Sequence, residues 1–137
     1  GGIAGFDVDV ATYTRDTGGE VEAHAAALTE IAPSILAVAL SFGTETTLAG
    51  RDTLDAADLV TVPASFWSGW EHDQLFLPSG YSYCTEAMGL LDLATQDAPP
   101  ASVVSVHFDD LYGRDHAAGV ARWAAAAGPA CSSRPTS

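Results

Sequence analysis

The densest group of residues able to do chemistry follows a short apolar stretch near the C-terminus. Its members are two imidazoles and three carboxylates: His107, Asp109, Asp110, Asp115 and His116. Imidazole and carboxylate side chains together can hold zinc or relay protons. Their spacing matches no standard metal motif, and aspartates also gather where a loop enters a helix, because they cap it. Both interpretations stay open, with helix capping the favoured one.

Other patterns that would point to catalysis are weaker. Glu71-His72-Asp73 lies in a predicted loop, where a solvated turn is the simpler interpretation. The glycines of residues 1–5 precede a predicted strand, whereas a dinucleotide fingerprint opens a helix. The nucleophile elbow Gly-x-Ser-x-Gly is absent from the sequence. We therefore expect no enzyme activity, no cofactor and no metal site.

Composition restricts the possible partners. The 137 residues suffice for one modest core, and 18 acidic against 5 basic residues give a net charge of −13. Such a charge argues against nucleic acid and anionic membranes, which bind cationic side chains. Cys84 and Cys131 form no metal spacing, and a free, buried Cys84 is expected rather than a disulfide. The sequence shows no apolar run long enough to span a membrane and no signal-peptide pattern.

Apolar periodicity predicts alternating strands and helices. Strands are expected at residues 6–12, 35–40, 58–62 and 102–107, and helices at 20–32, 45–57, 81–96 and 111–127. An aromatic-rich loop spans residues 64–80 and holds a possible short strand at 74–77. The alternation predicts an α/β fold, an open parallel sheet with helices on both faces. The polar tail, residues 129–137, is expected to be disordered.

The loops after three of these strands carry candidate ligand-binding groups. Ser41-Phe42-Gly43-Thr44 offers a hydroxyl and backbone N–H groups to a carboxylate, with simple helix capping by Thr44 as the alternative. Phe66 follows the third strand, and Tyr112 follows the fourth. Open α/β sheets bind ligands beyond the carboxyl ends of their strands. We therefore expect Thr44, Phe66 and Tyr112 to share one edge.

These motifs, in this order, resemble the type I periplasmic solute-binding proteins, the branched-chain amino-acid receptors of ABC importers. The matching features are a Gly-Gly-Ile-x-Gly loop at residues 1–5, Thr47-Leu48-Ala49 at a helix start, Pro63-Ala64-Ser65 after a strand, and Tyr112-Gly113 after an acidic turn. The resemblance covers residues 1–128 and implies a flavodoxin-like lobe, here a partial first lobe truncated at both ends. It departs from the family where Gly43-Thr44 replaces paired serines.

The resemblance implies a function and a set of site residues. Gly43 and Thr44 would hold a ligand carboxylate, while Ala64, Ser65 and Phe66 would complete a shelf that Tyr112 lines. The implied ligand is an amino acid or related amide, such as leucine, and the aromatic loop suits a larger or more apolar one.

The implied setting is extracytoplasmic, with ABC permease subunits as partners, in the periplasm or on the cell surface. Because a second lobe is missing, the chain is expected to be an incomplete fragment that binds weakly alone. The alternatives are an α/β enzyme using His107, Asp109, Asp110 and His116, and a non-functional gene fragment.

Overall fold

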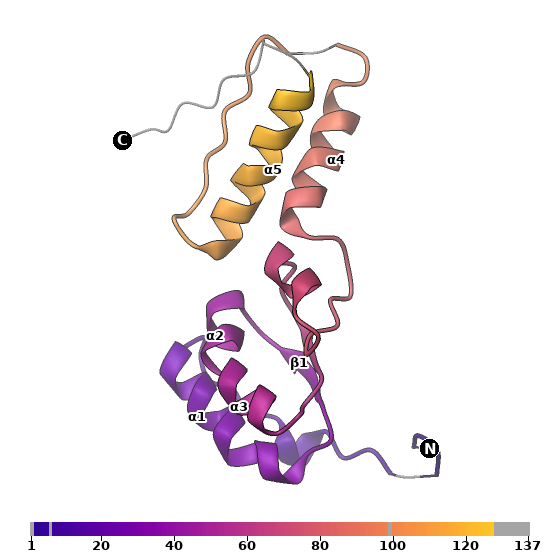
Figure 1. Cartoon of the computed structure of the whole chain (residues 1–137), viewed down its shortest axis with the longest axis vertical. Coiled ribbons are helices and arrows are strands. Elements are labelled where there is room, and N and C mark those ends of the chain that lie inside the picture. The colour runs from indigo at the N-terminus through magenta and orange to yellow at the C-terminus, as the bar shows by residue number, and fades with distance from the viewer. Residues whose placement is uncertain (1, 6, 99, 128–137) are drawn as a thin grey trace.

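The computed structural model describes residues 2–5, 7–98 and 100–127 (Figure 1). The described elements include two strands, β1 (Val38–Ser41) and β2 (Thr61–Pro63). The α-helices are α1 (Val21–Ile31), α2 (Thr44–Ala49), α3 (Arg51–Ala56), α4 (Tyr83–Thr95) and α5 (Leu111–Ala127). Short 3₁₀ helices are η1 (Ala11–Tyr13), η2 (Ala32–Ser34) and η3 (Ser68–His72). The predicted tail, residues 129–137, lies outside the described residues.

The sheet is small and parallel. β1 pairs with β2 in the register Val38 to Thr61 and Ser41 to Pro63, with an irregularity between the two pairs. On its other side Thr61 forms a parallel bridge to Phe76, which extends the sheet at the predicted short strand of residues 74–77. The predicted α/β class with parallel pairing is confirmed.

One hydrophobic core forms around this sheet in the described part of the chain. It gathers side chains from α1, η2, α3, η3, the sheet and the turn before β2: Leu28, Ala32, Val38, Leu54, Leu59, Trp70 and Phe76. The rings of Trp70 and Phe76 pack at 4.3 Å between centroids, so the aromatic-rich loop contributes two large rings to the core. At 1% exposure, Trp70 is almost completely buried.

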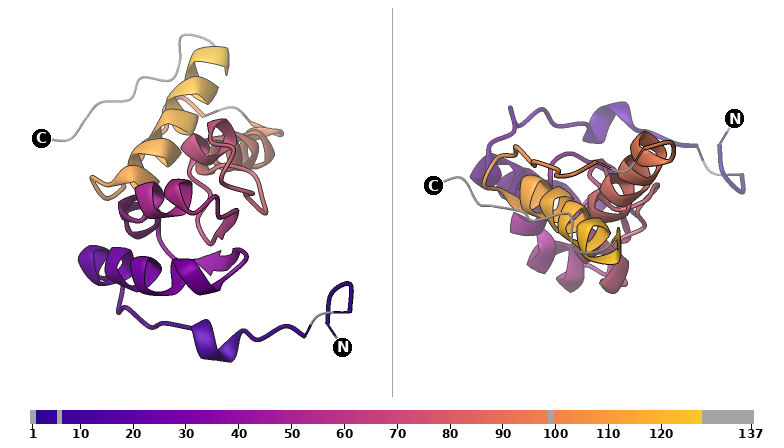
Figure 2. Two further views of the ribbon diagram at one scale, coloured as in Figure 1. Left: turned by 60° about the horizontal axis from the view of Figure 1, so that its bottom comes forward. Right: turned by 90° about the horizontal axis from the view of Figure 1, so that it is seen from above.

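Helices α4 and α5 form a second packing unit. Their interface buries Cys84 and Ala87 of α4 against Val120, Trp123 and Ala124 of α5. Residues 100–108 carry the chain back from the end of α4 to the start of α5, so the two helices run in the same direction (Figure 1). This pair stands at one end of the molecule, and α1, α2, α3 and the sheet lie at the other (Figures 1 and 2).

Two predicted strands are wrong. Residues 7–10 have no regular structure and lead into η1, and they run along the outside of the molecule at the end remote from α4 and α5 (Figure 2). Residues 102–107 are also outside any strand, with Val104 76% and Val106 94% exposed. A strand needs a backbone partner as well as apolar residues, and the described part of the chain gives these two segments none in a sheet.

The predicted helix at residues 45–57 is divided. It begins at Thr44 and is interrupted at Gly50, which separates α2 from α3. A side chain at Gly50 would collide with Leu28 of α1, so the glycine allows α1 to approach this corner closely. The other predicted helices match α1, α4 and α5 to within about two residues, which is the usual disagreement at helix ends.

Several apolar side chains of β1 and its flanks face solvent. Leu36 is 96%, Leu40 69% and Phe42 71% exposed, although the run was predicted to be covered on both faces. β1 is an edge strand of the described sheet. No helix in the described part of the chain is both long and apolar enough to cross a membrane.

Candidate functional site

The loop after β1 turns sharply into α2 at Gly43. Its φ of +86° lies in the left-handed region, which a glycine adopts without strain. Gly43 itself is the residue preceding the helix, and Thr44 is the first helical residue, so the alternative of helix capping by the Thr44 side chain is not what the structure shows. The loop is braced where the Thr46 hydroxyl donates a hydrogen bond to the carbonyl oxygen of Phe42.

A chain of polar side chains supports this loop from inside the molecule. His24 Nε2 lies 2.9 Å from Ser41 Oγ, which in turn lies 2.7 Å from Thr47 Oγ1. Ser41 and Thr47 are buried, and burial lowers the pKa of His24 below its ordinary value of 6.5. Sequence reasoning missed this arrangement, because His24 comes from a different helix and stands in no motif with Ser41.

The loop after β2 lies directly beside the loop after β1. The N–H of Ala64 donates to the carbonyl oxygen of Ser41 at 2.8 Å. Ser65 is buried, and its hydroxyl accepts a hydrogen bond from Trp70 Nε1 at 3.1 Å, so it is tied to the core. Phe66 is half-buried at the end of this loop.

A row of three aromatic rings connects this loop to α5. Phe66 packs edge-on against Tyr83 with 5.9 Å between centroids, and Tyr83 packs edge-on against Tyr112 at 4.6 Å. Edge-to-face pairs of this kind are favourable and set the relative orientation of the rings. We call Phe66, Tyr83 and Tyr112 the aromatic row. Its middle member, Tyr83, was predicted only as a helix residue.

Tyr112 reaches this edge through contacts of α5, since residues 102–107 form no strand. The N–H of Leu111 donates to Glu45 Oε1 at 2.9 Å, which joins the start of α5 to the first turn of α2. Gly113 follows, and a side chain there would collide with the carbonyl oxygen of Phe108. Tyr112 therefore places an exposed ring next to Gly113, whose lack of a side chain allows the close backbone contact at the start of α5. Tyr112 is 46% exposed.

The structure thus brings the predicted site residues to one region. Gly43 and Thr44 come from the β1 loop, Ala64, Ser65 and Phe66 from the β2 loop, and Tyr112 from α5. That these residues bind a ligand remains a prediction.

The polar cluster near the C-terminus does not converge on one point. Asp109 Oδ1 accepts a hydrogen bond from Arg114 Nε at 2.8 Å, and this contact lowers the pKa of Asp109. Asp110 Oδ1 accepts from the N–H of Gly113 at 2.7 Å, which is the capping that the favoured interpretation expected. His107 Nδ1 lies 2.8 Å from the carbonyl oxygen of its neighbour Phe108.

Asp115 and His116 lie farther along α5 and point to other partners. Asp115 is buried and bonds to Ser68, while the His116 ring lies 6.3 Å from the ring of Tyr112. Across residues 2–5, 7–98 and 100–127, no three His, Cys, Asp or Glu side chains gather as metal ligands would.

The Glu71-His72-Asp73 segment is anchored rather than being a simple solvated turn. Asp73 Oδ2 accepts from Arg51 Nε at 2.7 Å, and Asp73 Oδ1 accepts from the N–H of Leu75 at 3.1 Å. Burial alone would raise the pKa of Asp73, but these hydrogen bonds and the Arg51 charge outweigh it and lower the pKa. This segment borders an open cavity of about 540 Å³.

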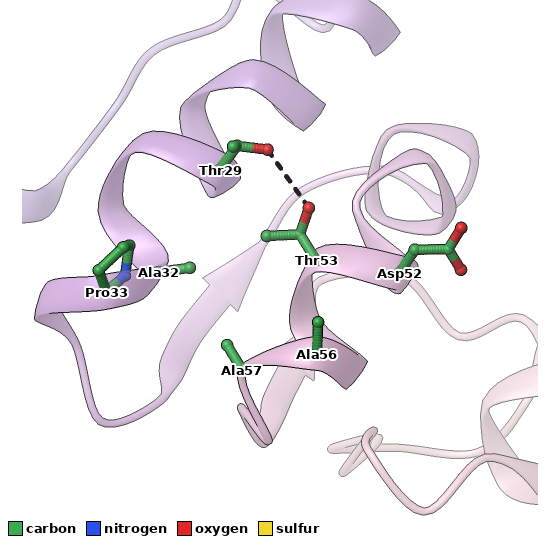
Figure 3. Close-up of a pocket in the computed structure, with 7 residues that line it drawn as sticks. All are labelled: Thr29, Ala32, Pro33, Asp52, Thr53, Ala56 and Ala57. Atoms are coloured by element: carbon green, nitrogen blue, oxygen red, sulfur yellow. Dashed lines mark hydrogen bonds between the residues drawn. The ribbon is translucent and has the colours of Figure 1, made fainter.

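A second cavity, of about 410 Å³, lies between the end of α1 and α3 (Figure 3). Its lining residues are small and mostly apolar: Thr29, Ala32, Pro33, Asp52, Thr53, Ala56 and Ala57. Thr29 and Thr53 close part of it with a hydrogen bond of 3.3 Å between their hydroxyls. None of the predicted site residues lines either cavity.

Comparison with known proteins shows the fold and not the family. No family model matches the chain, and no curated protein matches it. One solved structure is similar, the fatty acid ABC transporter substrate-binding protein from Thermomonospora curvata, with a TM-score of 0.77 and 16% sequence identity. The match covers 89% of this chain and 32% of that protein, so this chain spans about a third of its length.

The fold is therefore that of part of a substrate-binding protein. The expected resemblance to solute-binding proteins is confirmed at the level of the fold. The leucine/isoleucine/valine-binding type is not shown by this neighbour, which is described as a fatty acid binder.

Proposed function

We propose that this chain is part of an extracytoplasmic substrate-binding protein of an ABC importer, with permease subunits as partners and no catalytic role. The observation that carries the proposal is the convergence of the β1 loop, the β2 loop and the start of α5. Three separate segments meet where open α/β sheets hold their ligands. The fold of the neighbour supports the same role.

The ligand that suits this region has a carboxylate and an apolar body. Backbone N–H groups at Gly43 and Thr44 would take the carboxylate, because the start of a helix favours anions. The aromatic row would cover the apolar part. An amino acid and a fatty acid share this chemistry and differ in the ammonium group.

Two carboxylates near this region already accept hydrogen bonds from other residues. Glu45 accepts the hydrogen bond of Leu111 N–H, and Asp115 accepts two from Ser68. A ligand ammonium would have to compete with these contacts, whereas a fatty acid has no ammonium to satisfy. The fatty acid named for the structural neighbour fits this consideration. We therefore rank an apolar carboxylic acid above the branched-chain amino acid or amide that the sequence motifs imply.

Equilibrium dialysis of decanoate, 1-decanol and leucine against the chain tests this function. We expect decanoate to bind more tightly than 1-decanol, because only decanoate has the anionic group. Tyr112→Ala should weaken decanoate binding about tenfold, which corresponds to about 1.4 kcal/mol. Leu77→Ala, beside one of the other cavities, is the matched control and should leave binding unchanged. Equal binding of decanoate and 1-decanol would refute the proposal.

A further inference from the structure

Asp115 is a buried carboxylate whose two oxygens both bond to one residue of the other packing unit. Oδ2 accepts from the N–H of Ser68 at 2.9 Å, and Oδ1 accepts from Ser68 Oγ at 2.6 Å. The two residues are 47 positions apart in the sequence. Asp115 is only 8% exposed, and a charge so buried is costly unless it is hydrogen-bonded.

The position of this contact relates it directly to the aromatic row. Tyr112 and Asp115 are three residues apart on α5, so they lie on the same face of the helix. Ser68 begins η3, two residues after Phe66. The Asp115–Ser68 pair therefore joins the segment that carries Phe66 to the helix that carries Tyr112.

A two-point contact restricts rotation as well as separation. A single hydrogen bond would hold α5 near η3, but two parallel bonds to one carboxylate also orient the helix about its axis. Farther along α5 its packing against α4 holds the helix, and near the start of α5 the Asp115–Ser68 contact adds to this in holding the ring of Tyr112 against Tyr83, at the observed 4.6 Å. The second link, from Leu111 N–H to Glu45, is a single hydrogen bond from a backbone group, so it holds the start of α5 at one point and leaves rotation about the helix axis to other contacts.

We propose that Asp115 is a positioning residue, which through Ser68 places Tyr112 in the aromatic row and so shapes the ligand site. The inference deepens the proposed function and rests on it for the effect on ligand binding. The placement of the Tyr112 ring can be tested without any ligand.

The first measurement is the nuclear Overhauser effect between ring protons of Tyr83 and Tyr112, which are close enough to give it. Asp115→Ala should remove this signal while the Phe66–Tyr83 signal stays. Asp115→Asn should retain it, because an asparagine side chain can accept from the Ser68 N–H and donate to its hydroxyl. Asp109→Ala is the matched control, since it removes an exposed carboxylate near the same helix start, one that accepts a hydrogen bond from Arg114.

The second measurement is decanoate affinity by equilibrium dialysis. Asp115→Ala should weaken it at least fivefold, and Asp115→Asn and Asp109→Ala should stay within twofold of the parent. If Asp115→Ala does not fold, Ser68→Ala, which removes only the hydroxyl bond, replaces it and should weaken the Tyr83–Tyr112 signal.

Three outcomes of the two measurements separate the inference from the proposed function. A Tyr83–Tyr112 signal unchanged in both Asp115→Ala and Ser68→Ala would overturn the positioning role. If Asp115→Ala loses that signal and the parent chain does not bind decanoate, the positioning role is supported and the proposed ligand is refuted. Loss of the signal with undiminished decanoate binding would overturn the claim that Asp115 shapes the site.

Discussion

The packing of α4 against α5 gives the sharpest stability prediction, through two glycines. Gly119 of α5 is buried, and a side chain there would collide with the carbonyl oxygen of Cys84 and come within 2.9 Å of the Ala87 Cβ. Gly89 of α4 is exposed and has nothing within 4 Å of the same position. Gly119→Ala and Gly89→Ala are therefore the same chemical change in helices of the same unit, with opposite surroundings.

The two variants should change the free energy of unfolding in opposite directions. Replacing a glycine by alanine inside a helix stabilises it by about 0.5–1 kcal/mol, and Gly89→Ala should show that gain. Gly119→Ala has the same gain but forces a methyl group against backbone, and such overpacking costs about 1–3 kcal/mol. The collision is with main-chain atoms, so side-chain rotation cannot relieve it. We expect a net loss of about 1 kcal/mol, from the middle of the two ranges.

Urea unfolding followed by circular dichroism measures both values, with sucrose added to all samples if the parent chain is only marginally stable. Gly119→Ala should also weaken the Tyr83–Tyr112 ring signal, because separating the helices separates these rings. A Gly119→Ala variant as stable as Gly89→Ala would show that the helices do not pack as closely as the structure has them.

Three further predictions concern other parts of the molecule. Burial lowers the pKa of His24 below 6.5, so the unfolded chain takes up a proton first as the pH falls. The free energy of unfolding should decrease as the pH falls through 6.5. Urea titrations should show a smaller decrease for His24→Gln, and the same dependence of the free energy of unfolding on pH in parent and variant would contradict this. The exposed apolar residues of β1 should make the chain prone to associate. Leu40→Lys should lower the oligomer fraction in sedimentation velocity, and a parent chain that is monomeric at high concentration would contradict this prediction. Leucine should bind this chain more weakly than the low micromolar range, because a single open edge leaves most of the ligand in water; calorimetry showing tighter binding would contradict this.

Local sequence patterns were sufficient for α1, α4 and α5, although they missed the break at Gly50 between α2 and α3. The spacing of apolar residues along α1 and α4 depends only on neighbours within a few positions, so their bounds could be predicted. Strand formation depends on a partner elsewhere in the chain. Residues 102–107 carry a strand-like pattern, but the edge of β2 facing away from β1 is bonded to Leu75 and Leu77.

The candidate site was predictable in part, for a related reason. The rule that ligands bind beyond strand ends drew attention to Thr44 and Phe66, and the structure places their loops side by side. Tyr112 reaches the same region by a different route, through the contact of Leu111 with Glu45. The Asp115–Ser68 bond joins residues 47 positions apart, and no motif links them.

The most direct test of the proposed site is a ¹H–¹⁵N correlation titration of the chain with decanoate, with 1-decanol as the control for apolar contact. Because amide shifts report weak binding, the test does not require a tight complex. We predict saturable shifts at the amides of Gly43, Thr44, Phe66 and Tyr112 that 1-decanol does not reproduce. Shifts confined to the cavity around Thr29 and Thr53 (Figure 3), or the same shifts with 1-decanol, would contradict the account.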